Sequence, residues 1–279
     1  MFDSKPSTPN VPNAKPKINK DHIKLVYNFG LNDYKGNRND LRGCVNDAIE
    51  WRNLYHKYGY ESIMVTDKNI TKEAMIKALE NLVNLSHKYG GDFKGAFTFS
   101  GHGTHVEDLD GDEENGRDEA FALYDGLLID DDVRHILRKF NSEARLTVIA
   151  DCCHSGTITR SFLGLMDIEE YVKPRFLPPA DGIELNINSV PKHNLFIPED
   201  SMNEVLLTGC NPVEYSYDAY LGGKFIGAMT FHATNILKQR GNITFNELHK
   251  SLRKNLPTAN HPQSPQLEGR EENKEKLFF

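Results

Sequence analysis

The stretch Val148-Ile-Ala-Asp-Cys-Cys-His-Ser-Gly156 joins an apolar run directly to a group of reactive side chains. Continuous apolar runs of this kind are typical of strands buried in a parallel sheet. In open α/β sheets, ligands and reactive groups gather at the carboxyl ends of the strands. The stretch therefore predicts a strand that delivers a nucleophile to the carboxyl edge of a sheet.

A second apolar run, Ala96-Phe-Thr-Phe99, leads into Ser100-Gly-His-Gly103 in the same way. Its His102 precedes Cys153 by 51 positions, close to the separation of about 50 residues found between the His and the Cys of one class of cysteine proteases. A neighbouring imidazole activates a thiol by taking its proton. We expect Cys153 to be the nucleophile and His102 the base. The backbone amides of Gly103 and Cys153 are the expected donors to the oxyanion.

Two other interpretations of the cysteines need weighing. Free cysteines are among the most buried residues, and a core position suits Cys152, which continues the alternation of the strand, better than Cys153. Zinc is the rival interpretation, because Cys152, Cys153, His154, His102 and His105 are all of zinc-ligand type. Adjacent residues of a strand point to opposite faces, which disfavours a metal shared by the two thiols.

The composition is that of an ordinary globular protein, with 38% hydrophobic and 26% charged residues in a chain of 279. Acidic residues outnumber basic ones 40 to 33 for a net charge of −7, so nucleic acid is not an expected partner. No run approaches the roughly 18 apolar residues of a membrane-spanning helix, so no membrane is expected either. The four cysteines include an adjacent pair, a poor disulfide framework that favours a reducing, cytoplasmic location.

Residues 1–20 hold four prolines and lack the apolar core of a secretory signal. We expect a disordered arm there, followed by one domain over residues 21–279. Strand and helix patterns alternate along that domain, which predicts a largely parallel sheet with helices on both faces. Strands are predicted over residues 22–29, 62–66, 93–99, 145–150 and 204–208, and helices over 40–58, 130–140 and 225–238, after Thr71 and after the capping box Thr244-Phe-Asn-Glu247. Residues 104–126 and 157–202 show little periodicity and are expected to be long loops.

Three motifs carry a specific resemblance to the type I metacaspases, cysteine proteases of the caspase fold. They are Ser100-Gly-His-Gly103, Asp151-Cys-Cys-His-Ser-Gly156 and Leu41-Arg-Gly-Cys-Val-Asn-Asp-Ala48. The resemblance implies a caspase-like three-layer α/β/α sandwich. It also implies a monomeric cysteine endopeptidase that cuts proteins or peptides after Arg or Lys. Matched motif by motif, the catalytic positions are His102 and Cys153.

The same resemblance implies a pocket for the basic side chain of the substrate. Its lining residues would be Asp47, Ser100 and Asp151. Carboxylates in a partly buried pocket favour a guanidinium and repel an acidic side chain. The alternative for Asp47 is a solvated position on a helix.

Residues 108–119 carry seven acidic side chains. Their spacing imitates an EF-hand, but Glu113 stands where that loop requires glycine. The resemblance instead implies calcium ligands at Asp118, Asp130 and Asp131, with a fourth acid where this chain has Arg160. We therefore expect weak calcium dependence, or a need for millimolar calcium. The alternative is a solvated acidic loop followed by acids that cap a helix.

A protease that cuts after Arg or Lys has possible cleavage sites within its own chain. The segment 157–202 contains Arg160, Lys173, Arg175 and Lys192, and exposed loops are favoured sites of nicking. Self-cleavage there is expected to leave an N-terminal fragment of roughly 160–190 residues. Two interpretations from other classes are an inactive caspase-fold interaction module and an acidic calcium-binding sensor.

Overall fold

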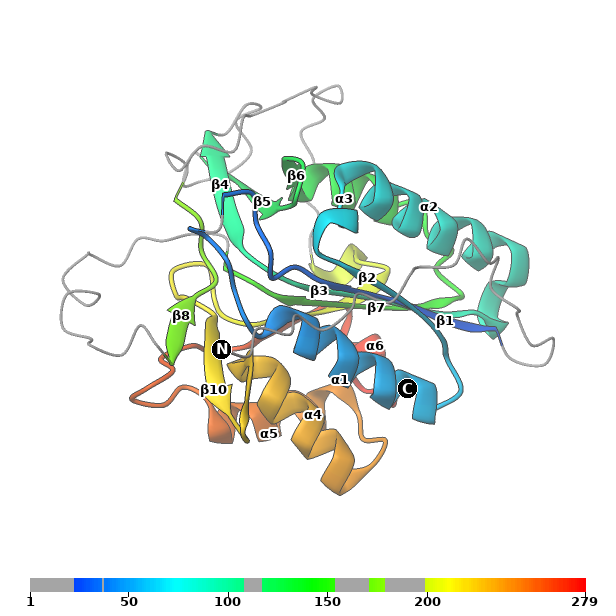
Figure 1. Ribbon diagram of the computed structural model, residues 1–279. Coiled ribbons are helices and arrows are strands. Elements are labelled where there is room, and N and C mark those ends of the chain that lie inside the picture. Colours follow the sequence, from blue (N-terminus) through cyan, green and yellow to red (C-terminus); the bar gives the residue numbers. More distant parts are fainter. Residues whose placement is uncertain (1–22, 37, 108–116, 154–170, 179–198) are drawn as a thin grey trace.

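The computed structural model describes residues 23–36, 38–107, 117–153, 171–178 and 199–279 (Figure 1). Its centre is a six-stranded sheet with the strand order β12-β9-β7-β3-β1-β2. All neighbours run parallel except the edge strand β12, which pairs antiparallel with β9. The strands of this sheet are β1 (Lys24–Gly30), β2 (Glu61–Thr66), β3 (Lys94–Ser100), β7 (Arg145–Asp151), β9 (Glu204–Thr208) and β12 (Gln266–Glu268).

Helices cover both faces of the sheet, as predicted (Figure 1). One face carries α2 (Lys72–Tyr89) and α3 (Asp130–Leu137), and the other carries α1 (Cys44–Lys57), α4 (Ala228–Arg240) and α5 (Phe245–Asn255). The short α6 (Glu271–Lys274) lies near the end of the chain. The result is a three-layer α/β/α sandwich.

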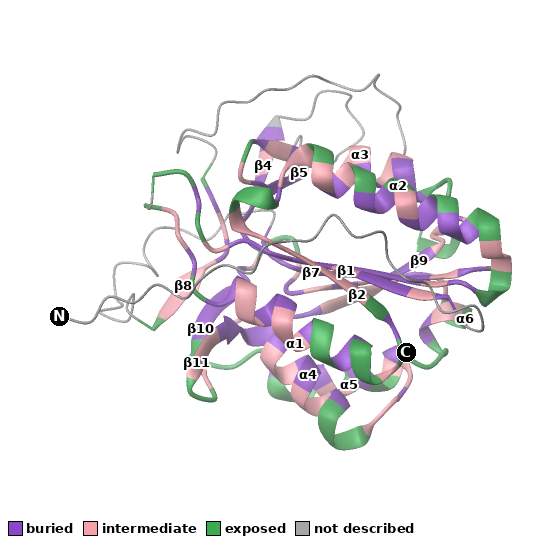
Figure 2. Cartoon of the chain, turned by 45° about the vertical axis from the view of Figure 1, so that its right-hand side comes forward, coloured by how far each residue is buried: buried purple, intermediate pink, exposed green. Residues whose placement is uncertain are grey.

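Each interface between the layers has its own apolar core. Leu79 of α2 belongs to one buried cluster with Phe97 of the sheet, and Trp51 of α1 belongs to the other with Ile149. Figure 2 shows the central strands largely buried, while exposed residues follow the outer faces of the helices. Strands covered on both faces read as continuous apolar runs, which is why the sequence predicts them well.

The capping residues predicted for the starts of two helices form their hydrogen bonds in the structure. The Thr71 side chain accepts a hydrogen bond from the backbone N–H of Ala74 at the start of α2. At the start of α5, Thr244 and Glu247 form a reciprocal capping box. Both caps satisfy N–H groups that a helix leaves without an internal partner.

Three predictions need correction, because the expected loop over residues 157–202 also contains a strand, β8 (Val172–Pro174). Residues 104–126, expected to be a loop, contain most of β4 (Gly103–Glu107) and all of β5 (Arg117–Ala122), which form a small antiparallel sheet with β6 (Leu127–Ile129). The helix predicted over 225–238 begins only at Ala228, because the preceding residues form strand β11 (Lys224–Gly227). That strand belongs to a third sheet with β10 (Tyr217–Leu221) and β8 (Val172–Pro174).

No helix in the described part of the chain is long and apolar enough to cross a membrane. The predicted arm over residues 1–20 lies outside the described residues.

Candidate active site

The two predicted reactive tips meet at one edge of the sheet. Strands β3 and β7 are parallel neighbours in a register that ends with Ser100 opposite Asp151. His102 and Cys153 each follow two residues after these positions, so both stand at the carboxyl edge of the sheet. Both side chains are buried, with exposed fractions of 1% and 0%.

The backbone amides predicted to form an oxyanion hole converge on a single oxygen. The N–H of Gly103 donates to the carbonyl oxygen of Arg175 at 3.0 Å, and the N–H of Cys153 donates to the same oxygen at 3.2 Å. Position 103 requires glycine, because a Cβ there would lie 2.0 Å from the carbonyl oxygen of Cys153. A peptide carbonyl of the chain itself thus occupies the predicted hole.

The imidazole of His102 is held from two sides. Its Nε2 lies 2.7 Å from the carbonyl oxygen of Asn39, and the ring of Tyr34 packs 4.8 Å away, centroid to centroid. Because a carbonyl can only accept, the proton belongs on Nε2, which leaves Nδ1 as the basic nitrogen. Within the described residues Nδ1 has no hydrogen-bond partner. Burial, opposed by the Asn39 carbonyl, lowers the pKa of His102 to about 3, so the ring is neutral. None of the sequence motifs indicates this role for Asn39.

The two adjacent cysteines have different surroundings. Cys152 is buried in the main apolar core, where burial raises the pKa of its thiol well above the usual value. Cys153 lies in a separate cluster with Cys210 and two tyrosines. Its Sγ accepts from the N–H of Ser216 at 2.6 Å and donates to the carbonyl oxygen of Ser216 at 3.3 Å. This division matches the expected core role of Cys152 and disfavours a zinc ion shared by the pair.

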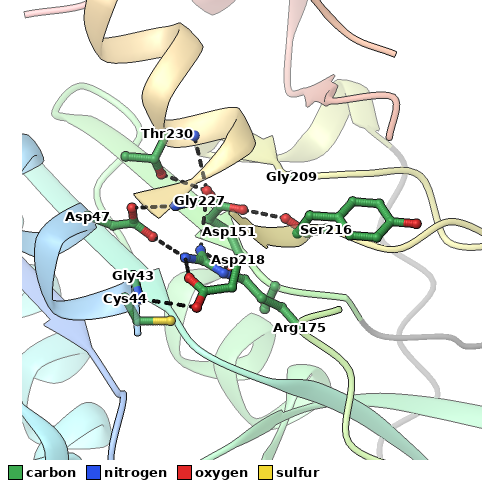
Figure 3. Close-up of polar contacts among 12 residues, drawn as sticks. Gly43, Cys44, Asp47, Asp151, Arg175, Gly209, Ser216, Asp218, Gly227 and Thr230 are labelled. Atoms are coloured by element: carbon green, nitrogen blue, oxygen red, sulfur yellow. Dashed lines mark hydrogen bonds and ion pairs between the residues drawn. The ribbon is translucent and has the colours of Figure 1, made fainter. Parts of the chain in front are cut away.

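The guanidinium of Arg175 is the centre of a fully buried ionic cluster (Figure 3). Its Nη2 lies 2.6 Å from Oδ2 of Asp47 and 3.1 Å from Oδ1 of Asp218. Its Nη1 lies 3.4 Å from Oδ2 of Asp151 and donates to the backbone oxygen of Asp151 at 3.0 Å. The pocket predicted for a basic side chain therefore holds one, and it contains Asp218 as a carboxylate that the motifs did not reveal.

The carboxylates are also held by the surrounding fold. Oδ1 of Asp47 accepts from the N–H of Gly227 at 2.8 Å, and Oδ2 of Asp218 accepts from the N–H of Arg42 at 2.8 Å. Oδ2 of Asp151 accepts from the hydroxyl and the N–H of Thr230 at 2.7 and 3.0 Å. Buried charges persist only when they are paired and hydrogen-bonded. These bonds orient the three carboxylates toward the position of the guanidinium.

Close backbone approach shapes the pocket wall. A Cβ at position 227 would lie 2.5 Å from Nη1 of Arg175, and a Cβ at position 43 would lie 2.1 Å from Oδ1 of Asp218. Glycine at these two positions leaves room for the ion pairs. Burial, strengthened by the charges of Asp151 and Asp218 and opposed by Arg175, raises the pKa of Asp47 to about 7.

Comparisons with known proteins agree with this geometry. The family model described as "Caspase domain" matches residues 24–276. A protein named Metacaspase-1 from Candida glabrata is 31% identical over 86% of this chain and 70% of its own length. The chain belongs to the metacaspases, within the caspase-domain family.

Other relatives extend the comparison. Metacaspase-1 from Kluyveromyces lactis is 27% identical over 86% of this chain, and the chain covers 64% of that relative's length. A crystal structure of a Geobacter sulfurreducens protein has the same fold, with a TM-score of 0.72 and 22% identity over 92% of this chain and 98% of that one. Metacaspases are cysteine-type peptidases, and the thiol and imidazole at the sheet edge suit that family chemistry.

The calcium ligands expected from the metacaspase pattern, Asp118, Asp130 and Asp131, remain a prediction. The described residues contain no group of three or more His, Cys, Asp or Glu side chains able to hold a metal ion. Asp130 pairs with Arg134 one turn along α3 at 3.1 Å, and Asp118 is buried on β5. Asp131 follows in the first turn of α3. Arg160 lies outside the described residues.

The metacaspase pocket pattern also included Ser100. It is buried at the end of β3, directly beside Asp151 in the strand register. A contribution of its hydroxyl to substrate binding remains a prediction.

Proposed function

We propose that the chain is a cysteine endopeptidase that cuts after Arg or Lys, with Cys153 as nucleophile and His102 as base. One observation carries the proposal. The carbonyl of Arg175 lies between the amides of Gly103 and Cys153 while its guanidinium fills the carboxylate pocket. The Arg175–Phe176 peptide bond thus takes the position of a substrate bond.

The proposed chemistry uses these groups, although the Cys153 thiol is hydrogen-bonded to Ser216 rather than to His102 in this structure. The Cys153 sulfur attacks the carbonyl carbon of the basic residue, and the negative charge that develops on oxygen is stabilised by the amides of Gly103 and Cys153. Nδ1 of His102 takes the thiol proton and donates it to the departing amine. Water then hydrolyses the thioester, with His102 as base again.

The residues before the scissile bond would bind as an added strand. The N–H of Arg175 donates to the carbonyl oxygen of Ser216 at 2.9 Å, and β8 pairs antiparallel with β10. Backbone pairing of this kind holds an extended peptide without demanding particular side chains. It leaves specificity to the pocket beneath Arg175, where a lysine ammonium could also meet the carboxylates.

The same placement supports Arg175–Phe176 as the bond of self-cleavage. Cutting it would give fragments 1–175 and 176–279, within the range expected from the sequence. Until the segment is cut or displaced, it blocks other peptides from the pocket. We therefore propose that the intact chain is latent.

Intact-mass measurement of freshly purified protein tests the proposal. Wild type should yield the two fragments, whereas Cys153→Ala should remain whole. Arg175→Lys should still cut, while Arg175→Gln should not cut at this bond because it lacks the positive charge. Lys173→Gln, two residues earlier, is the matched control and should cut like wild type. Wild-type protein that stays whole while it cleaves added peptides would refute the self-cleavage site. Self-cleavage of the Cys153→Ala variant would refute the assignment of Cys153 as the nucleophile.

Calcium enters this proposal as a weak modulator. The pairing of Asp130 with Arg134 supplies a positive charge close to one expected ligand without a metal ion. Self-cleavage should proceed in a chelator and change little on addition of millimolar calcium. Complete inactivity in the chelator with activation by micromolar calcium would contradict this.

A further inference from the structure

The residue after the scissile bond has a site of its own. Gly103 holds its backbone, because the Gly103 N–H donates to the carbonyl oxygen of Arg175 and the Gly103 carbonyl accepts from the N–H of Leu177 at 2.9 Å. Phe176 and Gly103 therefore form a parallel bridge. This bridge fixes the direction in which the side chain at position 176 leaves the backbone.

The side chain of Phe176 contacts two aromatic rings. The ring of Phe176 stacks on His105 of β4 at 5.8 Å between centroids with planes 21° apart. The ring of Phe176 also lies 5.7 Å from that of Tyr215 in a tilted arrangement, with planes 50° apart. Both distances fall in the range of favourable aromatic pairs. Phe176 also packs against the buried cluster that contains Cys153, so this site adjoins the nucleophile.

The positions of the two rings are fixed by other parts of the fold. His105 is held in the β4–β5 ladder opposite Glu119, and Tyr215 immediately precedes Ser216, whose backbone contacts the Cys153 thiol. Neither ring belongs to the carboxylate pocket or to the Cys–His pair. The requirement that these rings impose would thus be separate from the requirement for Arg or Lys.

We propose that His105 and Tyr215 form a subsite that selects an aromatic residue directly after the scissile bond, so that the substrate class is Arg or Lys followed by Phe, Tyr or Trp. The inference rests on the proposed peptidase function. An aromatic ring at this position stacks on His105 and makes a tilted contact with Tyr215, whereas a small or acidic side chain gains neither contact.

Internally quenched peptides that differ only after an Arg test the preference. With wild type that has completed self-cleavage, the kcat/KM for Arg–Phe and Arg–Tyr should exceed that for Arg–Ala by about tenfold, the factor expected for aromatic pairing. Arg–Asp should be cut more slowly still. In the chain itself, Phe176→Tyr should self-cleave like wild type and Phe176→Ala about tenfold more slowly.

Variants of the subsite separate selection from mere packing. An Arg-coumarin peptide has no residue after the bond, so the ratio of the Arg–Phe rate to the coumarin rate reports the subsite alone. His105→Ala and Tyr215→Ala should lower this ratio, His105→Phe should preserve it, and His56→Ala on the exposed side of α1 is the matched control. Equal rates for all residues after Arg would overturn the inference and leave the peptidase proposal standing. Failure to cut any substrate, the coumarin peptide included, would overturn both.

Discussion

Three carboxylates share one guanidinium in a site without solvent. Asp47, Asp151 and Asp218 all lie within 3.4 Å of Arg175, and each has an exposed fraction of 2% or less. Removing one partner from a buried ionic cluster has a large effect, because the remaining charges lose compensation. Each carboxylate should therefore matter for binding a basic side chain.

Asp218 gives the sharpest test of this pocket. Asp218→Asn keeps the shape and should lower the kcat/KM for an Arg-terminated coumarin peptide by about tenfold or more, since hydrogen bonds to charged groups contribute about 1.5–3 kcal/mol. Asp200→Asn removes an exposed carboxylate that is not part of this ionic cluster and serves as control. An unchanged kcat/KM in Asp218→Asn would remove Asp218 from the binding site.

Asp47 should make stability depend on pH. Its pKa is raised from 3.8 to about 7 by burial, so the folded state holds its proton more tightly than the unfolded state. The corresponding stabilisation is complete below about pH 4 and is lost as the pH rises through about 7. In the uncut Cys153→Ala background, the free energy of unfolding should fall between about pH 5 and 8. The additional change Asp47→Asn should flatten that slope.

Denaturant unfolding across this pH range measures the difference between the two variants. The titration of His102 changes the free energy of unfolding in the opposite direction. Because its pKa is lowered in the folded state, its contribution to stability is complete above about pH 6.5 and is lost on acidification. Its contribution is common to both variants and cancels in the comparison. Identical slopes would show that Asp47 does not titrate near neutrality.

At the scale of the elements, the turn from β3 into β4 builds the oxyanion hole. Gly103→Ala would place a methyl group 2.0 Å from the carbonyl oxygen of Cys153. The turn must then shift and withdraw one amide donor from the reacting carbonyl. The rate of self-cleavage should fall by about 10²–10³-fold, the usual effect of losing one such donor.

Timed gels of both proteins measure that fall, and circular dichroism checks that the fold persists. Gly126→Ala, at a glycine with positive φ and nothing within 4 Å of its Cβ position, controls for a general effect of losing a glycine. Wild-type rates in Gly103→Ala would exclude its amide from catalysis.

The elements also explain which predictions held. Strands β3, β7 and β9 are covered on both faces, so their apolar runs reveal them in the sequence. The strands β8, β10 and β11 are short and lie in a small sheet at the edge of the molecule, where periodicity is weak. This is why the start of α4 was predicted too early.

At the scale of the whole molecule, the docked segment predicts self-cleavage within one chain. Residues 172–174 are paired to β10 and the Arg175 side chain is seated in the pocket of the same chain, so the reaction needs no second molecule. The first-order rate constant for cutting should be constant when the protein concentration varies over about a hundredfold, because the effective concentration of a tethered substrate is fixed. A rate constant that rises in proportion to concentration would show cutting between chains.

The sequence by itself determined the parallel sheet, the helices on both faces, and the placement of His102 and Cys153 at one sheet edge. These follow from local patterns, because parallel strands with matching apolar runs bring their carboxyl ends together. Only the tertiary structure decided that Arg175 fills the pocket, that Asp218 joins it, and that Asn39 orients the imidazole. Arg175 and Asp218 are 43 positions apart and lie in or beside short strands. Their meeting depends on charge compensation and backbone pairing between distant segments, which leave no periodic signal in the chain.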